Sequence, residues 1–159
     1  MPTVRIRQYV YLGLVSRQVS AAEVTARLGV EPDRVRVRGA RSTRPPIPVF
    51  HAWEVVCDEP RLRVDEQLAR VVHRLTPHHA EIVALARELR SADPQHGGAV
   101  MRVVRYLAAE DGAEEELSSP DARLQKLPGQ HHLLSWTVDR EVLEFLSAVE
   151  ATLDVDEYG

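Results

Sequence analysis

The sequence predicts an α+β domain with a ferredoxin-like split βαβ core: strand, helix, strand, strand, helix and strand in order, extended by a C-terminal strand, helix and strand. Two observations lead to this prediction. Segments with β-branched or alternating apolar residues are followed by segments whose apolar residues recur every three or four positions. No linker interrupts the 159 residues. We therefore expect residues 1–159 to form a single domain, with an antiparallel-rich sheet and its helices on one face.

The clearest local signal is a capped helix over residues 20–28. Ser20 and Glu23 have the spacing of a capping box, in which each side chain accepts a hydrogen bond from the other residue's backbone N–H. Gly29 follows the last apolar position and suits the left-handed conformation that ends many helices. Pro32 prevents the helix from continuing. These residues predict both ends of the first helix.

The remaining elements follow from periodicity and from turn residues. One helix is expected to begin near Asp65, a new helix start falls at Thr76-Pro77, and a last helix follows Asp139. The proline-rich stretch 43–48 and the acidic stretch 110–121 are predicted as loops. The predicted strands cover residues 4–15, 34–38, 50–57, 99–108, 132–138 and 152–158.

Charge is unevenly distributed along a chain whose formal net charge is −4. Residues 27–44 contain six arginines against Glu31 and Asp33, whereas residues 109–121 contain six carboxylates and no basic residue. Such an asymmetry can steer a charged partner toward one end of the molecule. It is equally compatible with a homodimer in which the two segments complement each other.

An arginine strip is the candidate binding site. Arginine alternates with valine over 34–38, so the arginine side chains should leave one face of a strand. Guanidinium groups donate paired hydrogen bonds to anionic groups, and residues on the returning strand could add polar and stacking contacts. The candidate binding residues are Arg36, Arg38, Arg41, Arg44, His51 and Trp53.

Three functions are compatible with this strip, beside the simpler interpretation of a solvated edge strand with Trp53 in the core. Non-catalytic binding of a protein partner is preferred. A small-anion binder or an enzyme would use a pocket near His51 and Trp53. Nucleic-acid binding is opposed by the acidic overall balance and by an aromatic content of only 5%.

Other patterns exclude further classes of site. Cys57 has no second cysteine to pair with, and we expect it to be a buried, inert thiol. The seven histidines lack the spacing of helical metal ligands, and no nucleophile motif is present. We therefore expect no cofactor and no metal. The N-terminus lacks a signal-peptide pattern and no stretch is apolar enough to span a membrane, so we expect a cytoplasmic protein.

Several landmarks together resemble a known family. They are Leu28-Gly29-Val30-Glu31-Pro32, Arg38-Gly39, Trp53, Leu75-Thr76-Pro77 and the C-terminal Leu153-Asp154-Val155-Asp156-Glu157-Tyr158. In this order the chain resembles the bacterial domain of unknown function family 4279 over nearly its whole length. The resemblance implies a compact bacterial α/β domain and transfers no activity or catalytic residue. It is compatible with an immunity-type or regulatory binding module.

Overall fold

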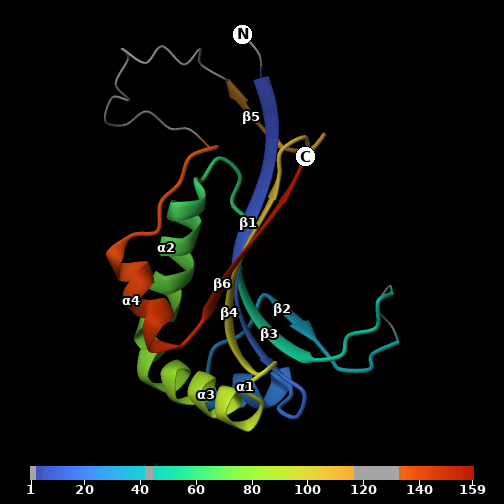
Figure 1. The fold of residues 1–159 in the computed structure, drawn as a ribbon, viewed down its shortest axis with the longest axis vertical. Helices are drawn as coiled ribbons and strands as arrows, with labels where there is room; N and C mark the ends of the chain where they lie inside the picture. The colour runs from blue at the N-terminus through green and yellow to red at the C-terminus, as the bar shows by residue number, and fades with distance from the viewer. Residues whose placement is uncertain (1–2, 42–44, 117–132) are drawn as a thin grey trace.

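The computed structural model describes residues 3–41, 45–116 and 133–159, and Figure 1 shows how their elements are arranged. The strands are β1 (Thr3–Ser16), β2 (Arg34–Arg36), β3 (His51–Cys57), β4 (Gly98–Tyr106), β5 (Ala113–Glu116) and β6 (Thr152–Tyr158). The helices are α1 (Ala21–Leu28), α2 (Val64–Leu75), the 3-10 turn η1 (Thr76–His78), α3 (His79–Ala92) and α4 (Arg140–Ala148). The predicted α+β class is confirmed.

One sheet organises the fold around the long strand β1. Its order is β2-β3-β1-β4-β6, and β5 pairs with the N-terminal end of β1. β1 is antiparallel to β3 and to β4, whereas β6 is parallel to β4. The helices lie on one side of this sheet (Figure 1). The expectation of an antiparallel-rich sheet with one covered face is therefore confirmed.

The core lies between the sheet and the helices. Alternate residues of β1, namely Val10, Leu12 and Leu14, are buried in one cluster with helix residues such as Leu68 of α2 and Leu85 of α3. Because successive side chains of a strand point to opposite faces, the other residues of β1 lie on the face that no helix covers. The alternation along β1 thus separates a packed face from an open one.

Helix α1 ends as the sequence predicts. The Glu23 backbone N–H donates to the Ser20 hydroxyl at 3.2 Å, and the Ser20 backbone N–H donates to the Glu23 carboxylate at 2.8 Å. Gly29 adopts a φ of 67° and its N–H donates to the Thr25 carbonyl. Both ends of α1 are therefore determined by local residues.

Three predicted elements differ from the structure. β2 stops at Arg36 instead of residue 38, because the backbone of Arg38 turns away and donates to the His51 ring. Residues 113–116 of the predicted acidic loop form β5, because the N-terminal end of β1 offers them an edge to pair with. Residues 133–138 form no strand, although the pattern predicts one over 132–138.

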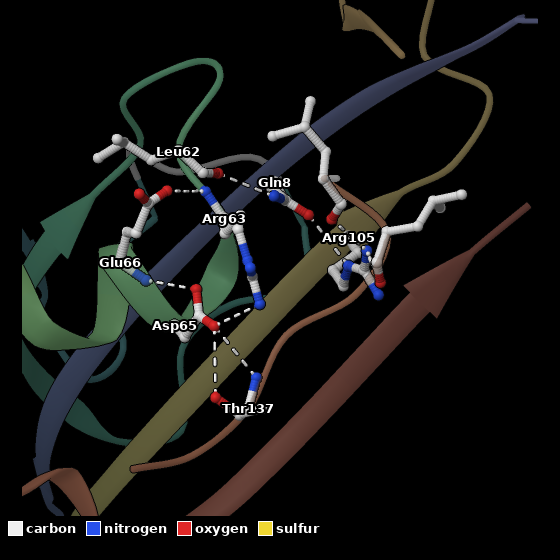
Figure 2. Close-up of polar contacts among 9 residues, drawn as sticks. Gln8, Leu62, Arg63, Asp65, Glu66, Arg105 and Thr137 are labelled. Atoms are coloured by element: carbon white, nitrogen blue, oxygen red, sulfur yellow. Dashed lines mark hydrogen bonds and ion pairs between the residues drawn. The ribbon is translucent and has the colours of Figure 1, made fainter. Parts of the chain in front are cut away.

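A buried arginine explains why residues 133–138 lie along the sheet without joining it. Arg105 of β4 points to the helix side, where it donates to the Gln8 side chain and to the carbonyls of Leu133 and Leu134 (Figure 2). Its guanidinium also pairs with Glu157 at 2.9 Å. The carbonyls of this segment therefore bond to a side chain where strand pairing would require a backbone N–H.

A second contact fastens the same segment to the start of α2. Asp65 accepts hydrogen bonds from Arg63, at 2.7 Å, and from the backbone and hydroxyl of Thr137 (Figure 2). No hydroxyl residue caps the N-terminus of α2. Instead, the Arg63 backbone N–H donates to the Glu66 carboxylate. Polar contacts thus join the N-terminus of α2 to the segment that leads into α4.

Candidate functional site

The open face of the sheet carries aromatic and charged side chains in the place of an apolar layer. All four tyrosines of the chain occupy strand positions whose side chains point to this face, namely Tyr9, Tyr11, Tyr106 and Tyr158. Two of them stack with ring centroids 5.1 Å apart, Tyr106 on β4 and Tyr158 on β6. The Arg34 guanidinium lies 4.9 Å from the centroid of the Tyr11 ring. Arginine and tyrosine side chains therefore stack on one another across the open face.

A groove of about 840 Å³ opens on this face. Tyr11, Glu54 and Arg102 belong to its floor, and its walls come from the segment before β3 and from the turn between α3 and β4. The two walls approach each other where the rings of Phe50 and His96 stack, with centroids 5.4 Å apart. The groove has the volume of a site for a small molecule or a peptide segment.

One wall of the groove is apolar and projects from the sheet. The described residues 34–41 and 45–50 form the hairpin arm, which projects from the body of the molecule (Figure 1). Ile47 and Val49 line the groove and are 49% and 64% exposed. Val35 and Val37 are also exposed on the arm. The described part of the arm therefore carries four exposed β-branched apolar side chains, two of which line the groove.

The cations on the groove floor already have carboxylate partners. Glu54 is only 3% exposed, and its two oxygens lie 3.0 Å from Arg34 Nε and 3.5 Å from Arg36 Nε. Arg102 pairs with Asp154 at 2.6 Å. A small anion would have to compete with these internal carboxylates, so the floor favours a ligand that binds by shape and apolar contact.

Tyr11 interacts electrostatically with both Glu54 and Arg102 on the groove floor. Burial raises the pKa of its phenol above the ordinary value of 10.0, and the nearby Glu54 carboxylate raises it further. A phenol that keeps its proton more firmly than a free tyrosine is a poor general base at neutral pH. The contacts of Tyr11 on this face are made by its ring, which stacks with Tyr9 and lies beneath the Arg34 guanidinium.

The raised pKa predicts a loss of stability in alkaline solution. The folded protein holds the Tyr11 proton more tightly than the unfolded chain, so this contribution is complete below the unfolded pKa near 10.0 and is lost as the pH rises through the folded pKa. Urea unfolding at a series of increasing alkaline pH values measures this decline in the free energy of unfolding. Tyr11→Phe should flatten the decline, and the prediction is wrong if wild type and variant decline in parallel.

The candidate residues do not form one strip. Arg36 lines the groove, whereas Arg38 donates to the Arg17 carbonyl at 3.0 Å. Arg41 is exposed and bonds to no other described residue, and Arg44 lies outside the described residues. The sequence thus places Arg36 and Arg38 on one face, but the turn after β2 separates them.

The two candidate residues of β3 are both engaged inside the fold. Trp53 is completely buried, and its indole N–H donates to the Thr25 hydroxyl at 3.1 Å. His51 accepts the Arg38 backbone N–H at its Nδ1. Neither residue lines the groove on the open face. Trp53 is therefore a core residue, and stacking of a ligand on its ring is excluded in this conformation.

Apart from Arg36, the residues that line the groove were not among the candidates predicted from the sequence. Ile47 stands between two prolines in the stretch 43–48, which is interpreted only as a loop, and Val49 follows that stretch, although apolar residues in an arginine-rich hairpin are a recognisable signal. Tyr11 and Arg102 belong to segments that the sequence predicts only as strands, 4–15 and 99–108. Their alternation with core residues could have marked the open face.

A second groove, of about 630 Å³, lies between the end of β3 and α2 and contains Cys57, whose thiol pKa is raised by burial. Residues 3–41, 45–116 and 133–159 contain no group of three side chains able to hold a metal ion. None of their helices is long and apolar enough to cross a membrane.

The fold and the groove define an α+β domain with one helical layer and an uncovered, arginine- and tyrosine-rich sheet face. The chain belongs to the family described as a domain of unknown function, DUF4279, whose model matches residues 5–159. The resemblance found in the sequence is thereby confirmed for the family itself. No curated protein and no solved structure matches the chain.

Proposed function

We propose that this protein is a non-catalytic binding module that holds an extended segment of a partner protein in the groove on the open sheet face. The partner segment would carry both apolar and acidic side chains. The observation that carries this proposal is the groove of about 840 Å³ with the exposed Ile47 and Val49 in its wall. An immunity-type or regulatory role would be one use of such a module.

The apolar part of the partner is argued from the arm. Fully burying a valine or isoleucine side chain gains about 1.5 to 3 kcal/mol, so covering the half-exposed Ile47 and Val49 gains about 1 kcal/mol each. Both line the groove together with Phe50, so an extended segment lying in the groove can contact all three. Tyr11 on the floor adds a flat surface for a further side chain.

The acidic part of the partner is argued from charge. Residues 34–50 contain five arginines and no carboxylate. Arg34 and Arg36 are balanced by Glu54, but Arg38 and Arg41 are exposed and form no ion pair with any described residue. Carboxylates of a partner would meet these unbalanced charges at the rim, where they guide association more than they add affinity.

Selection from random peptides tests the proposal and requires no assumption about the identity of the partner. The immobilised protein is used to select from a library of displayed random peptides, and the selected peptides are synthesised for fluorescence anisotropy. We expect sequences rich in apolar and acidic residues. The variant Ile47→Asp/Val49→Asp should bind them at least about tenfold more weakly, because two apolar contacts are lost.

Leu143→Asp is the matched control, since Leu143 is an equally exposed apolar residue on α4. It should bind the selected peptides like the wild type. Thermal unfolding of all variants verifies that the arm substitutions leave the core intact. The proposal is overturned if the library yields no binding peptide or if the arm variant binds the selected peptides unchanged.

We also infer that β1 to β4 with their helices are a ferredoxin-like core. The antiparallel order β2-β3-β1-β4 and the element sequence strand, helix, strand, strand, helix, strand support this inference. An experimental structure would test it through the hand of the two crossover connections, which should be right-handed.

A further inference from the structure

The two outer edges of the sheet have complementary sequences. The edge strand β2 is Arg34-Val35-Arg36, and the opposite edge strand β6 contains Asp154-Val155-Asp156. Both valines are exposed, Val35 to 53% and Val155 to 40%. The arginines and the aspartates all lie on the open face, and both valines lie on the helix side. Each edge therefore offers the charge that the other lacks.

The backbone of Val35 points away from the sheet. The Val56 backbone N–H donates to the Asp33 side chain, so the even-numbered residues of β3 direct their backbone groups toward β2. In the observed register, Arg34 and Arg36 stand opposite such residues. Since successive residues of a strand alternate in direction, the N–H and C=O of Val35 face outward.

The backbone of Val155 also points away from the sheet. The Leu107 backbone N–H donates to the Tyr158 carbonyl, so the even-numbered residues of β6 face β4. The N–H and C=O of Val155 consequently face outward, and neither Val35 nor Val155 has an additional backbone partner among the described residues. At each edge of the sheet, the outward backbone N–H and C=O of the valine are therefore available for pairing with another strand.

The directions of the two edge strands also match. β2 is antiparallel to β3, β3 and β4 are both antiparallel to β1, and β6 is parallel to β4, so β2 and β6 run in opposite directions. A second copy placed beside the first in the same orientation would bring its β2 antiparallel to β6. The open faces of the two copies would then form one continuous surface.

We propose that β6 of one copy pairs with β2 of a second copy and extends the sheet across the contact. Val35 stands opposite Val155 and exchanges two backbone hydrogen bonds with it, Arg34 stands opposite Asp156, and Arg36 stands opposite Asp154. The row Arg102, Asp154, Arg36 and Glu54 then alternates in sign across the interface. The existing pairs of Asp154 with Arg102 and of Arg36 with Glu54 are kept.

The same residues prevent each edge from pairing with itself. Two β2 strands would place arginine opposite arginine, and two β6 strands would place aspartate opposite aspartate, which is unfavourable for directly opposed residues. The contact therefore joins two different surfaces, and each added copy leaves one edge of each kind free. Association should produce a series of sizes and not a closed dimer.

Sedimentation velocity over a concentration series tests the association. The contact is short and belongs to the weak class of interface, so the series must reach about 1 mM. We expect the average mass to rise with concentration. Val155→Pro removes only the outward N–H of an edge strand and should weaken association about tenfold. Val155→Thr, which keeps the N–H, should associate like the wild type.

Disulfide trapping tests the register and does not depend on the proline variant. Proteins carrying Val35→Cys and Val155→Cys, each also with Cys57→Ala, are mixed and mildly oxidised. Opposed residues of a hydrogen-bonded antiparallel pair are about 5.5 Å apart at Cα, which suits a disulfide. The mixed disulfide should form about tenfold faster than one between Val35→Cys and Leu143→Cys.

Two results would overturn the proposal. One is a constant monomer mass over the whole series, and the other is cross-linking at Val155→Cys no faster than at the Leu143→Cys control. The contact uses Val35 and Val155, whereas the groove uses Ile47 and Val49. The Ile47→Asp/Val49→Asp variant should therefore keep self-association while losing peptide binding, which separates this proposal from the proposed function.

Discussion

Replacing Trp53 by alanine is expected to lower the free energy of unfolding by about 4 kcal/mol. Trp53 is completely buried beneath α1, and the substitution would leave a large cavity and remove the bond to the Thr25 hydroxyl. Such a loss is a large part of the stability of an ordinary domain. Urea unfolding followed by circular dichroism measures it.

His51→Ala is the matched control for the Trp53 substitution. His51 lies two residues away on the same strand and is half-buried, so its replacement should cost less than about 1 kcal/mol. Trp53→Phe retains most of the buried area and should lie between the two. Equal losses for Trp53→Ala and His51→Ala would contradict a core role for Trp53.

Replacing Arg105 by alanine is expected to cost about 3 to 4 kcal/mol. The Arg105 side chain is 4% exposed and donates to four acceptors, the Gln8 side chain, the Glu157 carboxylate and the carbonyls of Leu133 and Leu134. Its removal leaves the buried acceptors among them without this donor. Hydrogen exchange should show that protection falls first in residues 133–139, because Arg105 fastens this segment to the sheet.

Arg102→Ala is the control that isolates the effect of burial. Arg102 lies on the same strand, but it points to the open face and is about one-third exposed beside Asp154. An ion pair in such a position contributes about 1 kcal/mol or less. If both variants lose the same stability, the network around Arg105 does not hold the segment as described.

The sequence contained the information for elements whose residues bond locally. The capping box of Ser20 and Glu23 and the left-handed Gly29 involve partners within a few positions, so both ends of α1 could be read from the chain. The restart at Thr76-Pro77 was likewise local and appears as the 3-10 turn between α2 and α3. The strand at 152–158 was predicted with the bounds that the structure shows.

The segments 113–116 and 133–138, which were predicted incorrectly, both depend on distant partners. Residues 113–116 become a strand because the N-terminal end of β1, about 110 positions earlier, provides an edge. Residues 133–138 do not become a strand, and the carbonyls of Leu133 and Leu134 accept from Arg105 instead. The local patterns of the two segments favour the opposite assignment, because pairing with the sheet is decided by what lies beside each segment.

The candidate site divides in the same way. Alternation of arginine and valine predicted correctly that Arg34 and Arg36 share a face, because the period of a strand is a local property. The sequence by itself determined the α+β class, the family, the ends of α1 and the charge of the arm. Only the tertiary structure decided that Trp53 lies in the core and that Tyr11, Arg102 and the arm surround one groove. These residues come from separate strands, and their contacts depend on sheet order and on which face the helices cover.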